Sequence, residues 1–207
     1  FYATKNITTA EGGMLVMPDP TARERARILA LHGISRDAWK RYTAAGSWYY
    51  EVLASGHKYN LSDLHASLGL QQLKKVDRFH AIRRRYVARY EAGLRDLDAF
   101  DTPSEVGGTE HAWHLYLLRL RPGVLAIDRS TFIEELRARN IGTSVHFIPL
   151  HLHPYYRETW GYHPGDFPAA EAAYEATVSL PLYPAMTERD VDDVIQAIHD
   201  IVGRNCR

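Results

Sequence analysis

The chain has 207 residues, of which 45% are hydrophobic and 24% charged, an ordinary balance for a globular protein with a hydrophobic core. Its 25 basic and 25 acidic residues give a formal net charge of zero, so the composition predicts no nucleic-acid partner and no anionic membrane surface. The single cysteine, Cys206, excludes an intrachain disulfide framework and a cysteine-based zinc site and is typical of a reducing compartment. No apolar run approaches the roughly 18 residues of a membrane span.

Lys5 lies four residues from the start of the chain, ahead of the Gly-rich segment Glu11-Gly12-Gly13. We expect residues 1–17 to form a hairpin. Lys5 is then either an exposed lysine at a strand end or an amine desolvated by Phe1 and Tyr2, able to form a Schiff base with an aldehyde cofactor. The chain has no initiator Met and almost no residues before Lys5 to build a pocket, so we expect it to be the C-terminal part of a longer protein.

Hydrophobic periodicity predicts the next elements. Residues 21–31 have helical spacing, and His32-Gly33 ends this helix. The aromatic-rich segment 34–58 predicts an ordered loop. An apolar stripe over residues 61–97 predicts one long amphipathic helix with room for a single bend. The basic run at residues 83–85 is expected on the solvated face of that helix.

After a connection at residues 98–110, strands alternate with helices, which predicts a small α/β lobe. The expected elements are a strand at 111–120, a helix at 131–140, an alternating strand at 141–148, a helix opened by Pro168 and a last helix capped by Thr187 and Asp190. We therefore predict three parts: the remnant of a large domain at 1–60, an interdomain helix at 61–98 and a C-terminal α/β domain at 99–207.

Four further polar residues are candidates for a site. Asn60 precedes the long helix, where it serves either as an N-cap or, with the helix N-terminus, as a phosphate ligand. His146, His151 and His153 lie within eight residues. With no HExxH pattern and no nearby carboxylate, we favour a ligand-lining loop of His and Tyr donors over a metal site. Trp113 and its neighbour His114 are expected to pack in the strand.

These segments together resemble the DegT/StrS-type sugar aminotransferases, which are pyridoxal-phosphate enzymes of the aspartate-aminotransferase-like fold (fold type I). The resemblance covers essentially the whole chain, and the motifs keep the family's order. The matching segments are Phe1-Tyr2-Ala3-Thr4-Lys5, Thr9-Ala10-Glu11-Gly12-Gly13, His32-Gly33, Gly56-His57-Lys58-Tyr59-Asn60-Leu61-Ser62-Asp63 with Gln72-Leu73, His111-Ala112-Trp113-His114-Leu115-Tyr116, Gly142-Thr143-Ser144-Val145-His146-Phe147, Pro149-Leu150-His151, and Ser179-Leu180-Pro181-Leu182-Tyr183-Pro184.

The resemblance implies a cytoplasmic homodimer with shared active sites. Lys5 would bind pyridoxal 5'-phosphate covalently and move a proton to and from the α-carbon of glutamate, the usual amino donor. Asn60 would reach the cofactor phosphate of the partner subunit, and His146 and His151 would line the site of a nucleotide-linked keto sugar. The nearest members of the family by this resemblance are the 4-amino-arabinose and perosamine synthases, which act on 4-keto sugars.

Two alternatives stay open. A related branch dehydrates the sugar at C3 and has His in place of the lysine, so Lys5 favours transamination over dehydration. A non-catalytic fragment that only folds or dimerises is the other alternative. In the family, the phosphate-binding Ser, the Asp that pairs with the pyridine nitrogen and the ring-stacking aromatic all lie upstream of the lysine, so the 207 residues alone are expected to be inactive. His57 also stands where the family commonly has Tyr.

Overall fold

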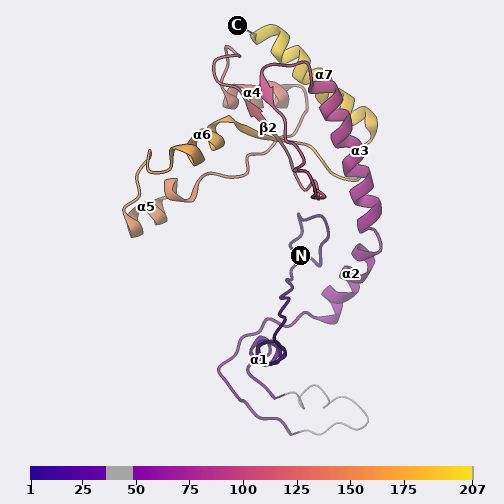
Figure 1. The fold of residues 1–207 in the computed structure, drawn as a ribbon, viewed down its shortest axis with the longest axis vertical. Helices are drawn as coiled ribbons and strands as arrows, with labels where there is room; N and C mark the ends of the chain where they lie inside the picture. The colour runs from indigo at the N-terminus through magenta and orange to yellow at the C-terminus, as the bar shows by residue number, and fades with distance from the viewer. Residues whose placement is uncertain (36–48, 207) are drawn as a thin grey trace. The chain divides into compact units, whose positions relative to one another are not determined.

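The computed structural model describes residues 1–35 and 49–206, which divide into two compact units, residues 1–76 and 77–207 (Figure 1). Trp39, Tyr42 and Trp48, three aromatic residues of the predicted ordered loop, lie outside the described residues.

Helix α1 of the first unit, Pro20–Ala30, is fixed at both ends by local interactions. The Asp19 carboxylate accepts a hydrogen bond from the Thr21 amide at 3.0 Å, which is the geometry of an N-cap. At the other end Gly33 takes a left-handed φ of 69°, and its amide donates to the Ile28 carbonyl at 3.0 Å. The helix predicted at 21–31 and its glycine end are confirmed.

The hairpin predicted for residues 1–17 is wrong. This segment is a compact loop, in which the Lys5 amide donates to the Tyr2 carbonyl at 3.0 Å and the Thr9 amide donates to the Phe1 carbonyl at 3.0 Å. Because the backbone closes on itself over spans this short, it offers no extended row of donors and acceptors to a partner strand.

The single helix predicted for residues 61–97 is two helices. Helix α2, Asp63–Leu73, and helix α3, Val76–Leu94, are separated at residues 74–75. Leu68 and Leu73 are five residues apart, but both lie within α2, so the spacing of the apolar residues does not mark the break.

The second unit contains a three-stranded antiparallel sheet in the order β1-β2-β3, made of Phe100–Asp101, Tyr116–Leu120 and Thr177–Leu180. The strand predicted at 111–120 begins only at Tyr116. Trp113 has a φ of 45°, a left-handed conformation that an extended strand does not contain.

Three helices of this unit match the sequence prediction: α4 (Arg129–Ala138), α6 (Pro168–Ala176) and α7 (Glu188–Asn205). Helix α4 contacts β3 and α7, and helix α6 contacts β2 (Figure 1). The helices after β2 are α4 (Arg129–Ala138), the short 3₁₀ turn η2 (Leu150–Leu152), α5 (Pro154–Trp160), α6 (Pro168–Ala176) and α7 (Glu188–Asn205).

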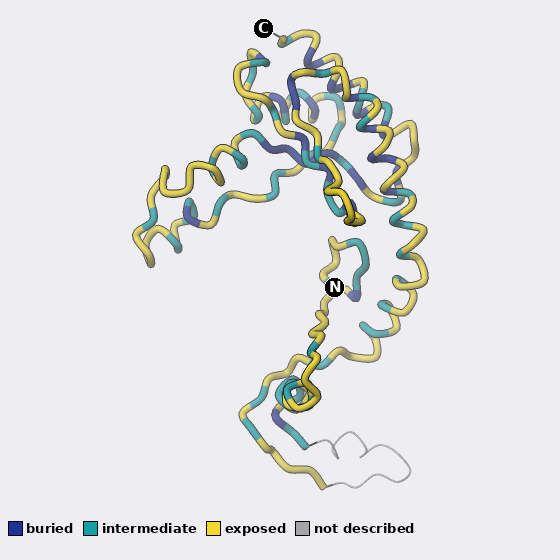
Figure 2. Tube along the Cα trace, in the orientation of Figure 1, coloured by how far each residue is buried: buried dark blue, intermediate teal, exposed yellow. Residues whose placement is uncertain are grey.

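The buried residues of the described chain concentrate in the second unit, on α3, the sheet, α4 and α7 (Figure 2). Tyr116 and Leu118 alternate inward along β2 and lie opposite Leu180 and Val178 of β3. Phe132 of α4 is fully buried against the same core. These contacts make the second unit the part of the chain with a continuous hydrophobic core.

Helix α7 follows the sequence prediction closely. The Thr187 hydroxyl accepts from the Asp190 amide, and the Asp190 carboxylate accepts from the Thr187 amide at 2.6 Å, which together form a capping box. Ile195 of this helix is half-buried. The buried residues of this helix are Val191, Val194, Ala197, Ile198, Ile201 and Val202.

The basic run on α3 is not one solvated face. Arg83 is only 6% exposed, whereas Arg84 and Arg85 are exposed as predicted. Nη1 of Arg83 donates to three backbone carbonyl oxygens, those of Trp113 at 3.0 Å, His114 at 3.2 Å and Leu182 at 2.8 Å.

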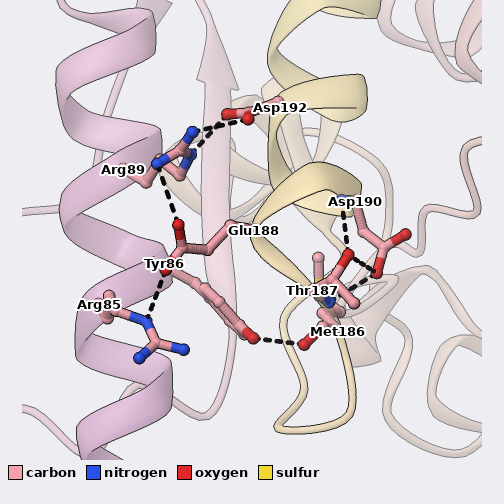
Figure 3. Close-up of polar contacts among 8 residues, drawn as sticks. All are labelled: Arg85, Tyr86, Arg89, Met186, Thr187, Glu188, Asp190 and Asp192. Carbon is pink, nitrogen blue, oxygen red and sulfur yellow. Dashed lines mark hydrogen bonds and ion pairs between the residues drawn. The ribbon is translucent and has the colours of Figure 1, made fainter.

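Two further side chains of α3 bind the same carbonyl-rich segment. The hydroxyl of Tyr86 donates to the Met186 carbonyl (Figure 3), and that of Tyr90 donates to the Pro181 carbonyl at 2.8 Å. Residues 181–186 contain two prolines and form no sheet ladder, so their carbonyls need donors from side chains. Three positions of α3 supply those donors, because residues three, four and seven apart share one helix face.

Exposed ion pairs run alongside these buried contacts. Arg85 lies 3.3 Å from Glu188, and Arg89 forms two parallel contacts with Asp192 at 2.5 and 2.6 Å (Figure 3). Pairs at exposed positions contribute little to stability, so they align α3 with α7 more than they hold the unit together.

The strand predicted at 141–148 is wrong as an eight-residue strand. Only Ser144 pairs with β3, through reciprocal backbone hydrogen bonds with Ser179 at 2.8 and 3.2 Å. The alternation of residue types was present, but the chain leaves the sheet edge on both sides of this one-residue bridge.

Candidate functional site

Lys5 lies on the compact loop at the start of the first unit, and it is exposed. Tyr2 is 52% exposed, and an exposed Lys5 corresponds to the first of the two alternatives that the sequence left open. The Lys5 backbone is held in a turn, because its amide donates to the Tyr2 carbonyl at 3.0 Å.

Glycines fix this loop against helix α2. A Cβ added to Gly12 would lie 2.5 Å from the Thr9 hydroxyl oxygen and 3.4 Å from Leu61, and Gly12 has a φ of 156°. A Cβ on Gly69 of α2 would lie 2.8 Å from the Thr9 methyl group. Thr9 itself is buried. The loop that carries Lys5 therefore lies close to Leu61, just before α2, and to the middle of α2 at Gly69.

The Asn60 segment is positioned by the end of α1. The amide of His57 donates to the Leu29 carbonyl at 2.7 Å, and the amide of Tyr59 donates to the Ala30 carbonyl at 2.7 Å. The last carbonyls of a helix lack partners within the helix, so this segment supplies the missing donors. As a result, the residues between and after these two amides have a fixed backbone.

Two glycines of separate motifs allow this close approach. A Cβ on Gly33 would lie 1.8 Å from the Ala54 carbonyl oxygen, and a Cβ on Gly56 would lie 2.1 Å from the Gly33 nitrogen. No side chain fits at either position without moving the backbone. Two sequence motifs therefore meet through their backbones: His32-Gly33 and the segment from Gly56 to Asn60.

Asn60 is not the N-cap of α2. Ser62 fills that role, with its hydroxyl accepting from the His65 amide at 3.3 Å. The side-chain oxygen of Asn60 accepts a hydrogen bond from the Lys58 ammonium, and this pairing leaves the Asn60 amide NH₂ to donate to a ligand. Sequence reasoning missed Lys58, although it stands within the motif that contains Asn60.

His146 and His151 are both in the second unit but have different environments. Nδ1 of His146 shares a hydrogen with the buried Ser179 hydroxyl at 2.7 Å, which fixes the half-buried ring. His151 is 5% exposed, and its Nε2 lies 2.7 Å from Oε1 of Glu171. Sequence reasoning missed Glu171, because the carboxylate lies 20 residues away on α6 and no local pattern links it to His151.

The hydrogen bond from His151 is the main cause that lowers the pKa of the Glu171 carboxyl, followed by the hydrogen bond from the Gly165 amide.

Among the residues that the structure describes, no three His, Cys, Asp or Glu side chains are grouped to hold a metal ion. No helix in residues 1–35 and 49–206 is long and apolar enough to cross a membrane.

Comparison with known proteins decides the family. The sequence profile of the DegT/DnrJ/EryC1/StrS aminotransferase family matches residues 1–199. The chain belongs to this family. Its α/β structure matches the C-terminal half of the pyridoxal-phosphate sugar aminotransferases of fold type I, as the sequence predicted.

Two curated relatives are similar to nearly the whole chain. It is 53% identical over 205 residues to an uncharacterized protein of Methanocaldococcus jannaschii, covering 99% of the chain and 53% of the relative. It is 49% identical over 203 residues to the spore coat polysaccharide biosynthesis protein SpsC of Bacillus subtilis, covering 98% and 52%. The chain thus spans about half the length of these relatives.

A solved family structure shows the same fold. The PLP form of Spr1654 from Streptococcus pneumoniae, described as a sugar aminotransferase, has a TM-score of 0.83 and 30% sequence identity, with 99% of this chain and 50% of that chain covered. The residues described above therefore lie in a chain that has the fold of this aminotransferase family.

Proposed function

We propose that the full-length protein containing this chain transfers an amino group from glutamate to a nucleotide-linked 4-keto sugar, with pyridoxal phosphate as cofactor. The proposal rests mainly on the position of Lys5. It lies within the residues that match the family profile, on a loop where Gly12 and Gly69 closely approach Thr9. The cytoplasmic homodimer, the likeness to 4-amino-arabinose and perosamine synthases, and the domain limits at residues 60 and 98 are parts of the same proposal.

The residues present fit the cofactor. Lys5 offers a primary amine at an exposed position, the group that condenses with an aldehyde. Lys58 and Asn60 together offer an ammonium and an amide NH₂, which are donors suited to phosphate oxygens. In the proposed homodimer this pair would hold the phosphate of the cofactor in the partner subunit.

The chain's own residues would then act as follows. Bound pyridoxal phosphate supplies an electron sink that weakens the bonds to the amino acid's α-carbon. Lys5 holds the cofactor and then moves a proton at that carbon as a general base and acid. His146, whose Nδ1 is occupied by Ser179, presents its remaining ring nitrogen Nε2 to a sugar hydroxyl.

Product analysis tests the proposal. The full-length protein is loaded with pyridoxal phosphate and incubated with glutamate and a 4-keto sugar nucleotide. We expect 2-oxoglutarate and an amino sugar nucleotide in equal amounts, and neither product with Lys5→Arg. A deoxygenated sugar without an amino group would instead identify the dehydratase alternative, and 2-oxoglutarate without an amino sugar would contradict the proposed acceptor.

A further inference from the structure

Ser179 is a buried polar residue in strand β3, between two side chains of the hydrophobic core. Its neighbours Val178 and Leu180 belong to that core. Because side chains alternate along a strand, Ser179 points to the opposite face of the sheet. It is only 4% exposed, so its hydroxyl depends on a protein group for a hydrogen bond.

The backbone brings His146 to this hydroxyl. Ser144 and Ser179 exchange two backbone hydrogen bonds, at 2.8 and 3.2 Å, so they lie directly opposite each other. His146 follows two positions after Ser144, and diagonal neighbours of this kind are within reach of a long side chain. Nδ1 of His146 lies 2.7 Å from the Ser179 hydroxyl oxygen. The one-residue bridge at Ser144 therefore places the histidine ring beside the serine.

The second ring nitrogen of His146 has no partner in the described part of the chain. Three side-chain nitrogen or oxygen atoms of the described residues are buried without a partner, and they belong to Arg83, Tyr116 and Arg129. Nε2 of His146 is not among these atoms, and no residue of the described ranges binds it. Solvent therefore reaches Nε2, while Nδ1 is held by the serine.

A serine hydroxyl differs from a carboxylate as a partner for histidine. It has one hydrogen to donate and lone pairs that accept. When the hydroxyl donates to Nδ1, the neutral imidazole carries its hydrogen on Nε2, which then donates. When the hydroxyl accepts from Nδ1–H, Nε2 is an acceptor. A carboxylate, which only accepts, would impose the second arrangement alone. Ser179 thus fixes the ring of His146 and leaves the role of Nε2 adjustable.

We infer that Ser179 is a positioning residue for substrate binding, which holds Nε2 of His146 toward a hydroxyl of the sugar nucleotide. This inference rests on the proposed function for the identity of the ligand. A sugar hydroxyl both donates and accepts, so it bonds to Nε2 in either tautomer of the ring. Because Ser179 is buried and bonded to Nδ1, its effect on the ligand passes through the histidine.

Equilibrium binding to the full-length protein tests the inference without turnover. In the pyridoxal-phosphate form and without glutamate there is no amino group to transfer, so a 4-keto sugar nucleotide binds without reacting, and calorimetry gives its Kd. We expect Ser179→Ala to raise this Kd about tenfold, the effect of one lost hydrogen bond. Ser179→Thr keeps the hydroxyl and should return the Kd to within about threefold of the original value.

A neighbouring serine provides the matched control. Ser144 belongs to the same bridge, but it is exposed and contributes only backbone hydrogen bonds to Ser179. Ser144→Ala should therefore leave the Kd unchanged. Urea unfolding of the same variants separates positioning from stability. If Ser179→Ala lowers the free energy of unfolding but leaves the Kd unchanged, the serine is purely structural and the inference is overturned.

A double-mutant cycle tests whether the serine acts through the histidine. His146→Phe keeps a ring at this position and should raise the Kd about tenfold by itself. Adding Ser179→Ala to that protein should then have no further effect on the Kd. The same cycle with His146→Ala gives a second test that does not depend on packing a new ring. A further tenfold loss in the double variants, or an unchanged Kd in both His146 variants, would overturn the inference.

The two proposals fail separately. If the protein transfers amino groups to a keto sugar nucleotide but Ser179→Ala leaves the Kd unchanged, the function stands and the role of Ser179 is wrong. If the Kd values follow the expected cycle but no amino transfer occurs, the role of Ser179 stands and the proposed function is wrong.

Discussion

Nη1 of the buried Arg83 donates to the carbonyl oxygen of Leu182 at 2.8 Å, across 99 positions of the chain. The same nitrogen binds the Trp113 and His114 carbonyls, so one guanidinium joins α3 to two irregular segments. Burial lowers the pKa of the Arg83 guanidinium, because it removes water from the cation.

Arg83→Lys should destabilise the protein by about 3 kcal/mol, because a lysine keeps the charge but cannot reproduce the planar group that reaches three carbonyls. The measurement is the free energy of unfolding in urea. Arg84→Lys, at the adjacent exposed position, is the control and should change stability by about 0.5 kcal/mol or less. Similar decreases in the free energy of unfolding for the two variants would show that the buried hydrogen bonds of Arg83 add no stability.

Gly33→Ala should destabilise the first unit by more than about 2 kcal/mol. The residue has a φ of 69°, and the added Cβ would lie 1.8 Å from the Ala54 carbonyl oxygen, so the backbone contact with residues 54–56 must open. Gly13→Ala is the matched control, since a Cβ there meets no atom within 4 Å. Thermal unfolding followed by circular dichroism distinguishes them, and a Gly33→Ala protein as stable as the Gly13→Ala protein would refute the contact.

Phe132→Ala should cost about 3–5 kcal/mol, because Phe132 is fully buried between the sheet and the helices and its removal leaves a cavity. Phe147→Ala removes the same group from a residue that is 73% exposed, and its cost should be below about 1 kcal/mol. Urea unfolding of both variants checks this difference. Equal costs would mean that Phe132 is not a core residue.

The His151–Glu171 pair predicts a pH dependence of stability. The pKa of Glu171 is lowered in the folded state, chiefly by the hydrogen bond from His151. A lowered carboxyl pKa contributes stability that is fully present above the unfolded value of 4.5 and is lost as pH falls through the lower folded value. Glu171→Gln should therefore flatten the stability profile below pH 4.5, as measured by urea unfolding at a series of pH values. An unchanged acid profile would contradict the pairing.

Elements whose signals are local were predicted well from the sequence. The capping box of Thr187 and Asp190 and the glycine after α1 are each encoded within a few residues. Elements that depend on distant partners were not. The alternation at residues 141–148 indicates a strand, but only Ser144 finds a pairing partner on β3. Arg83 has the sequence appearance of a solvated residue, and only the carbonyls of remote segments explain its burial.

The candidate site follows the same division. Motifs identified Lys5, Asn60, His146 and His151 as candidates, and the roles given to them remain predictions. Lys58 and Glu171 were missed because their contacts appear only after folding, one beside Asn60 and the other across 20 residues from His151. The sequence left both an exposed and a desolvated Lys5 open, and the structure has Lys5 exposed.

Reductive trapping tests whether Lys5 carries the cofactor. The full-length protein is incubated with pyridoxal phosphate, reduced with borohydride, digested and analysed by mass spectrometry. We expect a phosphopyridoxyl group on the peptide that contains Lys5. In Lys5→Arg, both this group and the cofactor absorbance should be lost. A protein with no adduct at Lys5, or with the adduct only at another lysine such as Lys58, would contradict the role of Lys5.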